Sequence, residues 1–143
     1  RGVDGAGLDG DYGISVWRPD TTYFEDANRE TFIVAQIETP QAVENVEQIA
    51  AVPGIDCLFI GPADLTLRLR TSGSPLALPD VVERVSAVAK RAGIAWGITA
   101  GSPEAVAEYR KKGAQIVPWG GDFSLMNVLK QCSEELDAVL ANE

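Results

Sequence analysis

Two acidic residues stand at the ends of two apolar runs in the sequence. Glu38 directly follows the run 32–37, FIVAQI, and Asp64 follows the run 57–60, CLFI, after a turn at 61–63. Continuous apolar runs of this length, bounded by Gly and Pro, are typical of strands buried on both faces of a parallel sheet. Neighbouring strands lie about 4.8 Å apart. Both carboxylates can therefore reach one point at the carboxyl edge of the predicted sheet.

Two carboxylates at one point suggest a metal site. A hard divalent cation such as Mg²⁺ or Mn²⁺ prefers oxygen ligands, commonly one or two carboxylates completed by water and substrate. The alternative is that Glu38 and Asp64 each cap the helix after their strand, a role in which Asp is common. Position in the sequence leaves both interpretations open.

Small and polar residues surround the two acids. The Gly-Pro-Ala turn at 61–63 removes side-chain bulk where a ligand would approach the backbone, although such a turn also forms without a ligand. The amides of Ala63 and Asp64, at a helix start, could hold a carboxylate. Gln36 points to the same side of its strand as Glu38. It is therefore either a packing residue or a hydrogen-bond donor to substrate.

The elements that would position these residues alternate along the chain. We expect a short helix from Thr21 or Thr22 to about Asn28. We then expect strands at 31–37, 56–60, 94–99 and 114–119, helices at about 40–53, 79–92, 102–112 and 122–141, and a short helical piece at 65–69. Cap-then-proline pairs at 39–40 and 102–103 begin two of the helices. Two helices have clear buried faces: Ala42, Val43, Val46, Ile49 and Ala50 in the first, and Val81, Val82, Val85, Val88 and Ala89 in the second. The order βαβαβαβα predicts either a doubly wound sheet or a piece of a (β/α)₈ barrel, and both place chemistry at the carboxyl ends of strands.

Composition excludes several classes of protein. The chain has 143 residues, 45% of them hydrophobic, which is enough for one domain with a core but below the roughly 250 residues of a complete (β/α)₈ barrel. Twelve basic and 21 acidic residues give a formal charge of −9, and we expect no nucleic-acid partner. No run approaches the roughly 20 apolar residues of a membrane span, and the first residues do not resemble a signal peptide. We expect a cytoplasmic protein without membrane contact.

Histidine is absent from the sequence. This excludes a Ser-His-Asp triad, a Cys-His pair and any His-ligated metal site built from this chain alone. We expect Cys57, in a strand, and Cys132, in a helix, to be buried thiols rather than a disulfide. Trp17, Trp96 and Trp119 have no basic residues interleaved with them, and we expect them in the core or at its rim.

Four segments closely resemble the HpcH/HpaI family of class II pyruvate aldolases. They are VAQIET at 34–39, GIDCLFIGPADLTLRL at 54–69, AWGITA at 95–100 and AQIVPWGGD at 114–122. The resemblance covers essentially all of 31–143, and the pair QIET and FIGPADL at this separation is specific.

The resemblance implies a site. Glu38 and Asp64 would be the protein ligands of a divalent metal, Mg²⁺, Mn²⁺ or Co²⁺, which acts as a Lewis acid on pyruvate or oxaloacetate. The residues expected at the substrate are Gln36, Gly61, Pro62, Ala63, Asp64, Thr99 and Ala100. The implied reaction makes or cleaves a carbon–carbon bond between an enolate derived from these 2-oxo acids and an aldehyde.

The resemblance also implies a fold, of which this chain supplies a part. The fold is a (β/α)₈ TIM barrel, and the chain would form a single domain, 1–143, that is its C-terminal half. Residues 1–30 would be a loop and a short helix, and 31–143 four βα units. The catalytic base and the arginine that stabilises the enolate would lie on the other half, outside this chain. Four strands cannot close a barrel, so the rest must come from a missing segment or a second chain.

Alternatives remain at the level of function and assembly. One is a CoA-ester lyase of the malyl or citramalyl type, for which we find no basic groove for the CoA phosphates. Another is a non-catalytic half-barrel subunit that keeps a metal and carboxylate pocket but lacks the base.

The helix at 122–141 carries an apolar stripe broader than one packed helix requires, although it could be an ordinary last barrel helix. The resemblance implies a homo-oligomer, a hexamer, that exchanges this helix.

Overall fold

The computed structural model describes residues 22–141, apart from the side chain of Phe123. The loop expected over residues 1–20, with Trp17, lies outside them. The elements are α2 (Tyr23–Glu30), β1 (Ile33–Ile37), α3 (Pro40–Glu44), α4 (Val46–Ala50), β2 (Ile55–Ile60), α5 (Pro62–Thr71), α6 (Leu78–Ala92), β3 (Ala95–Ile98), α7 (Pro103–Lys111) and α8 (Asp122–Leu140). No helix in this part of the chain is long and apolar enough to cross a membrane. The alternation expected from the sequence is present, and the chain is an α/β protein.

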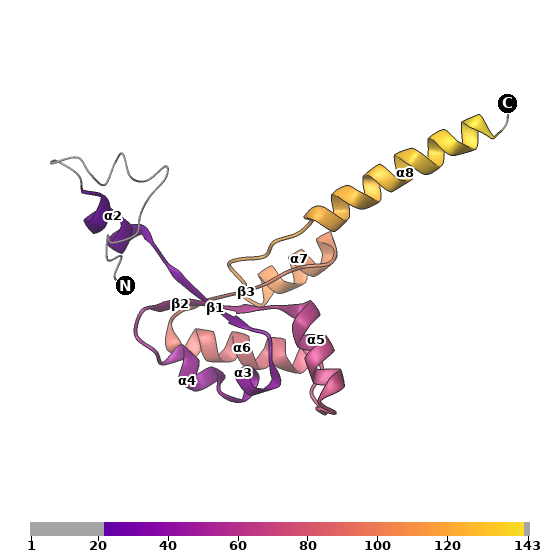
Figure 1. Cartoon of the computed structure of the whole chain (residues 1–143). Coiled ribbons are helices and arrows are strands. Elements are labelled where there is room, and N and C mark those ends of the chain that lie inside the picture. The colour runs from indigo at the N-terminus through magenta and orange to yellow at the C-terminus, as the bar shows by residue number, and fades with distance from the viewer. Residues whose placement is uncertain (1–21, 142–143) are drawn as a thin grey trace.

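The sheet has three parallel strands in the order β1-β2-β3. Ile60 pairs with Ile37 on one side and with Ile98 on the other, so the three carboxyl ends are level. Helices α3, α4 and α6 lie together along one side of the sheet (Figure 1). This arrangement brings the ends of β1, β2 and β3 to one edge, as the site prediction requires.

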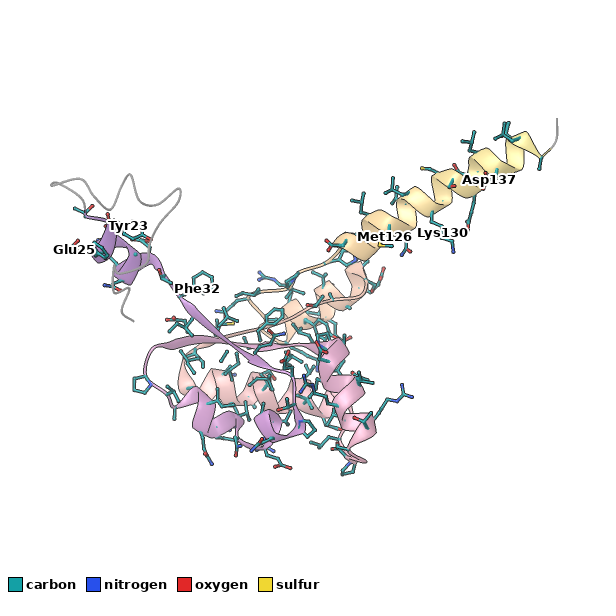
Figure 2. The ribbon with its side chains drawn as sticks, viewed as in Figure 1. Tyr23, Glu25, Phe32, Met126, Lys130 and Asp137 are labelled. Carbon is teal, nitrogen blue, oxygen red and sulfur yellow. The ribbon has the colours of Figure 1, made fainter. Side chains whose placement is uncertain are left out.

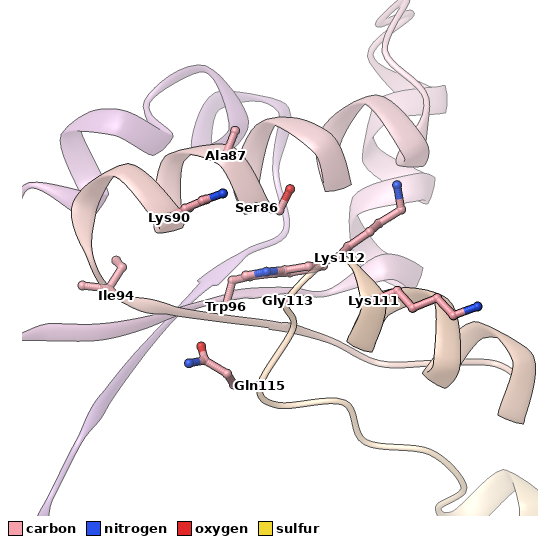
Figure 3. Close-up of a pocket in the computed structure, with 9 residues that line it drawn as sticks. All are labelled: Ser86, Ala87, Lys90, Ile94, Trp96, Lys111, Lys112, Gly113 and Gln115. Atoms are coloured by element: carbon pink, nitrogen blue, oxygen red, sulfur yellow. The ribbon is translucent and has the colours of Figure 1, made fainter.

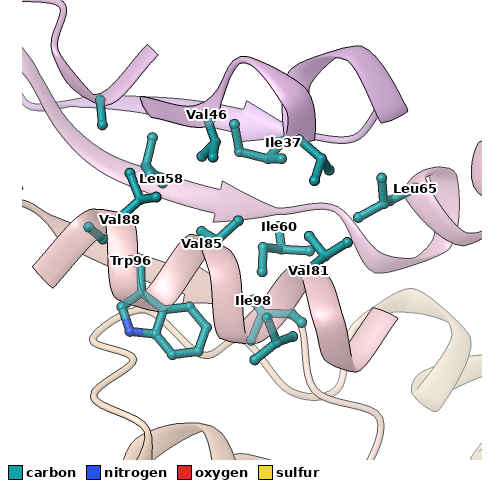
Figure 4. Packing of buried hydrophobic residues seen from close by; sticks show 14 of the residues in the cluster. Ile37, Val46, Leu58, Ile60, Leu65, Val81, Val85, Val88, Trp96 and Ile98 are labelled. Atoms are coloured by element: carbon teal, nitrogen blue, oxygen red, sulfur yellow. The ribbon is translucent and has the colours of Figure 1, made fainter. Parts of the chain in front are cut away.

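The core lies between the sheet and these helices. Alternate strand residues face it, because successive side chains of a strand point to opposite faces, and the valines of α6 pack against them (Figure 4). The buried residues include Ile37, Leu58, Ile60, Trp96 and Ile98 from the strands, Val43, Val46 and Ala50 from α3 and α4, and Val81, Val82, Val85, Val88 and Ala89 from α6. The buried face predicted for α6 is confirmed in full, and Ala42 and Ile49 on the other predicted face are half-buried.

Local capping chemistry sets where the helices begin. Thr39 Oγ1 accepts a hydrogen bond from the Ala42 amide at 3.0 Å, and Ser102 Oγ accepts one from the Ala105 amide at 3.2 Å. Both are the side-chain caps that the cap-then-proline pairs predict. Gly93 ends α6 with φ +69°, a left-handed conformation that favours glycine.

The helix expected at 40–53 is two short helices. Asn45 separates α3 from α4 with ψ 12°, outside the helical range. Asn is a poor helix former because its side chain competes for backbone hydrogen bonds. The short helical piece expected at 65–69 is longer than predicted, because α5 has ten residues.

The predicted fourth strand, 114–119, is not a regular strand. It follows β3 in parallel, but only isolated bridges join Gly97 to Ile116 and Ala100 to Trp119. Ile98 N–H donates to the Ile116 carbonyl at 3.0 Å, and the next ladder bond would need an N–H at residue 118. That residue is Pro118, which has none. The proline thus interrupts the ladder.

Helix α8 extends away from the rest of the described structure (Figure 1). Its labelled side chains Met126, Lys130 and Asp137 project from the helix with no other element beside them (Figure 2). The expectation that Cys132 is buried is wrong, because every side chain that the structure describes in this helix is exposed, whereas Cys57 is buried as expected. Burial raises the pKa of the Cys57 thiol. Both cysteines are free.

Candidate functional site

The candidate site lies at the carboxyl edge of the sheet, where β1 and β2 end side by side. The Gly61 amide donates a hydrogen bond to the Ile37 carbonyl at 3.2 Å, one residue beyond the last strand pair. Glu38 therefore leaves β1 at the level where the chain turns from β2 into α5. The register thus provides the strand-end position predicted for Glu38, and Asp64 lies in the first turn of the helix that follows β2.

Gly61 is buried directly beside the side chains of Gln36 and Glu38. A Cβ placed on Gly61 would lie 2.9 Å from Gln36 Nε2, 3.4 Å from Glu38 Cβ and 3.6 Å from Glu38 Oε2. The φ of Gly61 is −88°, which any residue can adopt, so the backbone conformation does not require glycine. A side chain there would displace the end of the Gln36 side chain and lie in ordinary van der Waals contact with Glu38, so glycine is what lets Gln36 lie this close to the backbone. The sequence could place Gln36 and Glu38 on one side of a strand but not against Gly61.

Asp64 is exposed in the first turn of α5, two residues after Pro62. Gly61 holds the N-cap position of this helix, which has no side-chain cap, and Thr39 caps α3. Neither Glu38 nor Asp64 is therefore a side-chain cap. The acid at position 64 still lies favourably with respect to the helix dipole.

The start of α5 offers backbone donors as well as a carboxylate. The first helical hydrogen bond joins the Leu65 amide to the Gly61 carbonyl at 3.0 Å. The amides of Ala63 and Asp64 precede it, and amides in a first helical turn have no acceptor within the helix. Two N–H groups are thus available at this edge for an anionic group such as a carboxylate.

The end of β3 completes the edge. Thr99 is exposed and Ala100 is buried, with the Ala100 amide bonded to the Pro118 carbonyl at 2.9 Å. The Ala100 bridge also brings Trp119 to this edge, where the residue is 59% exposed. The sequence analysis missed Trp119 as a candidate wall of the site. Its position, one residue before Gly120-Gly121 at the end of the last predicted strand, is the signal that could have shown it.

The donor set at this edge fits a hard divalent cation. Within residues 22–141, no side chain or amide hydrogen-bonds to the carboxylates of Glu38 or Asp64, and no ion pair involves them. The same residues contain no group of three or more His, Cys, Asp or Glu that could hold a metal ion. A site here would have two protein carboxylates and take its remaining oxygens from water and substrate, which is common for Mg²⁺.

Comparison with known proteins identifies relatives of the chain. Residues 5–127 match the family model for HpcH/HpaI aldolase/citrate lyase. The chain is 38% identical over 107 residues to a 2-dehydro-3,6-dideoxy-6-sulfogluconate aldolase of Pseudomonas putida, covering 73% of this chain and 42% of that one. It is 34% identical over 139 residues to a hydroxypyruvate/pyruvate aldolase of Paraburkholderia phytofirmans, covering 95% and 52%.

The fold is likewise shared with a solved structure. A HpcH/HpaI aldolase/citrate lyase family protein from Burkholderia cenocepacia superposes with a TM-score of 0.66 at 38% identity, over 80% of this chain and 46% of that one. The chain thus spans about half the length of the relatives it matches.

Proposed function

The chain belongs to the HpcH/HpaI aldolase/citrate lyase family, and on that premise we propose that it provides the metal and substrate half of a divalent-metal-dependent aldolase. The reaction makes or cleaves a carbon–carbon bond between an enolate derived from pyruvate or oxaloacetate and an aldehyde. The observation that carries this proposal is the packing of Gln36 and Glu38 over the bare backbone of Gly61, at the strand end that leads into Asp64.

Glu38 and Asp64 are the proposed metal ligands. Their carboxylates have no competing hydrogen bonds from other described residues, and Mg²⁺, Mn²⁺ or Co²⁺ would accept this donor set. When bound, the cation would supply Lewis-acid polarisation of the 2-oxo acid's carbonyl group. The two acids hold negative charge at the edge where a cation and an anionic substrate must meet.

The other edge residues have binding roles in this proposal. The amides of Ala63 and Asp64 hold the carboxylate of the 2-oxo acid, and the Gln36 amide donates to a substrate oxygen. Gly61 and Pro62 keep the approach to the backbone clear. Thr99 and Ala100 line the pocket on the side of β3, with Trp119 as the added wall.

The catalytic base and the enolate-stabilising arginine are proposed to lie outside this chain. The sequence contains no histidine to act as the base, and the chain spans about half of its relatives. We propose that these 143 residues are the C-terminal four βα units of a (β/α)₈ barrel. The partner is then the rest of that barrel, on the same polypeptide or on another. The assembly is proposed to be a homo-oligomer, a hexamer that exchanges α8.

A non-catalytic binding subunit is the second candidate function, favoured by the absence of histidine. Pyruvate release from a 4-hydroxy-2-oxo acid, measured with Mn²⁺ or Mg²⁺ on the protein that includes the rest of the proposed barrel, separates the two candidates. The aldolase proposal predicts metal-dependent release that Glu38→Gln abolishes, while Glu44→Gln, an exposed acid on the adjacent helix α3, leaves it unchanged. Cleavage of a CoA thioester alone would identify the CoA-ester lyase. Metal binding without any release would identify the binding subunit.

A further inference from the structure

A cavity lies between the last turns of α6 and α7, beside the start of β3 and therefore at the opposite end of the sheet from Glu38 and Asp64. Its volume is about 440 Å³, within the range of small-molecule sites. The residues that line it are Ser86, Ala87, Lys90, Ile94, Trp96, Lys111, Lys112, Gly113 and Gln115 (Figure 3). It shares no residue with the candidate metal site.

Positive charge is concentrated in this cavity. Three of the four lysines of the chain line it, and no Asp or Glu does, although the chain as a whole has 21 acidic residues and a charge of −9. Lys90 and Lys111 form no ion pair with another described residue, whereas Lys112 pairs with Glu83. A concave surface that carries charge of one sign concentrates its electric field inside the cavity and attracts a small ion of the opposite sign.

Neutral hydrogen-bond donors also line the cavity. The ring of the buried Trp96 reaches towards Gly113, whose Cβ, if present, would lie 3.9 Å from the indole Nε1. Neither this N–H nor the side-chain amide of Gln115 has a hydrogen-bond partner among the described residues. An oxyanion has only hydrogen-bond acceptors and negative charge. Free N–H donors beside unpaired ammonium groups therefore match it in both hydrogen bonding and charge.

The helix dipoles explain only part of this arrangement. Lys90 and Lys111 lie in the last turns of their helices, where cations are favourable for the helix itself. Arg68 and Arg70 occupy the same place in α5. The dipole does not account for the absence of acids from the lining, nor for the free indole and amide donors.

We propose that this cavity binds a small multivalent oxyanion, either a di- or tricarboxylate or a phosphorylated metabolite. The ammonium groups of Lys90 and Lys111 supply most of the attraction, and the Trp96 N–H and Gln115 amide orient the anion. Ala87 and Ile94 provide an apolar wall for its carbon body. The site is independent of the proposed aldolase chemistry.

Titration calorimetry on metal-free protein tests the proposal, with citrate and pyrophosphate as separate probes. We expect saturable binding of one anion per chain with a Kd below about 1 mM, about 4 kcal/mol. Binding of citrate alone would indicate a carboxylate ligand, and binding of pyrophosphate alone a phosphorylated one. No saturable binding of either probe would overturn the proposal.

Matched double variants locate the anion. Lys90→Gln with Lys111→Gln is expected to weaken binding at least tenfold, whereas Arg68→Gln with Arg70→Gln removes the same charge from another last turn and is expected to change it less than threefold. Equal losses in the two variants would mean non-specific attraction and contradict the site. Asp64→Asn must leave anion binding unchanged, because tighter binding after removal of this negative charge would place the anion at the carboxyl edge.

Fluorescence provides a readout that does not depend on the lysines. Trp96→Phe keeps an aromatic ring at this position and removes the indole N–H, so we expect weaker binding and loss of the fluorescence change that the anion causes. Circular dichroism verifies that each variant is folded. An unaltered fluorescence response in Trp96→Phe would show that the anion binds elsewhere.

Discussion

Asp64 is the residue at which the metal proposal can be tested without knowing the substrate. Because Gly61 holds the cap position of α5, the Asp64 carboxylate is not needed to cap the helix. Asp64→Asn keeps the shape of the side chain and removes ligand charge. We expect Mg²⁺ or Mn²⁺ to bind at least tenfold more weakly, about 1.4 kcal/mol, with little change in the unfolding free energy of the metal-free protein. Calorimetric titration measures the first quantity and urea denaturation the second.

Asp80 is the matched control for this substitution. It occupies the third position of α6, as Asp64 does in α5, and its carboxylate accepts a hydrogen bond from the Ala77 amide at 2.9 Å. Asp80→Asn should lower stability slightly and leave metal affinity unchanged. If Asp64→Asn behaved in the same way as Asp80→Asn, Asp64 would be a helix-start residue only, and the proposed metal site would have to be abandoned.

The sequence predicted individual site residues by their place at the ends of apolar runs. That argument needs only strand periodicity and the level ends of parallel strands, and both are present here. It could not show that Gln36 and Glu38 fill the space above Gly61, since this depends on side-chain packing between two strands. It also could not show that three lysines at the ends of two helices share one cavity, because their spacing in the sequence suggested only helix ends.

At the scale of elements, Gly97 joins β3 to the segment 114–119. A Cβ at Gly97 would clash with the Ile116 carbonyl oxygen and lie 2.8 Å from Ile116 Cβ, and the backbone of that segment cannot rotate away as a side chain can. We expect Gly97→Ala to lower the free energy of unfolding by about 2 kcal/mol, the usual cost of overpacking. Urea denaturation measures the change. Gly101→Ala is the control, because nothing lies within 4 Å of its Cβ position; similar losses in both variants would contradict the explanation.

A second prediction at this scale concerns pH and the contact between α4 and α6. Arg84 donates to the Glu47 carboxylate at 2.9 Å and to the Glu44 carbonyl at 3.1 Å. The hydrogen bond from Arg84 lowers the pKa of Glu47. Glu47 thus binds its proton more weakly in the folded than in the unfolded state, so its contribution is complete above about pH 4.3 and is lost as the pH falls through the lower folded pKa.

Glu47→Gln should therefore reduce the unfolding free energy at pH 7 by less than about 1 kcal/mol, because half-exposed ion pairs are weak. The difference from the wild type should shrink as the pH is lowered from 7 towards 3. Urea midpoints at the two pH values measure it. Glu44→Gln, which removes a neighbouring acid that forms no ion pair with a described residue, is the control; a deficit for Glu47→Gln as large at pH 3 as at pH 7 would argue against the ion pair as its cause.

The order of elements was predictable because each has strong local signals. Thr39-Pro40, Ser102-Pro103 and Gly93 mark helix ends by capping chemistry that depends on few neighbours. The misses have local causes too. Pro118 interrupts the fourth strand by lacking an N–H, and Asn45 divides a helix. Both residues can be read from the sequence. Apolar periodicity alone, however, does not show that a backbone N–H donor is missing or that a residue is a poor helix former.

At the scale of the molecule, three features are incomplete within residues 22–141. Strand β1 has one sheet neighbour, and Phe32, Ile33 and Val34 at its start are 60%, 42% and 40% exposed. The last strand position is held by bridges only. Helix α8 leaves large apolar side chains in water: Leu125, Met126, Val128, Leu129, Leu136, Val139 and Leu140. Exposed strand edges and exposed apolar helix surfaces of this kind are typical of sites that bind another protein surface.

We therefore expect the protein to be an oligomer, with α8 buried between copies. Light scattering at micromolar concentration should give a mass of several chains, and Leu129→Glu with Leu136→Glu should lower it by placing charge in an apolar contact. Ser133→Glu adds charge to the same helix at a polar residue and serves as the control. A monomeric wild-type protein, or equal dissociation by the control, would show that α8 has another partner. The most direct candidate would then be the proposed rest of the barrel, for which intact mass and a search for a second polypeptide would test.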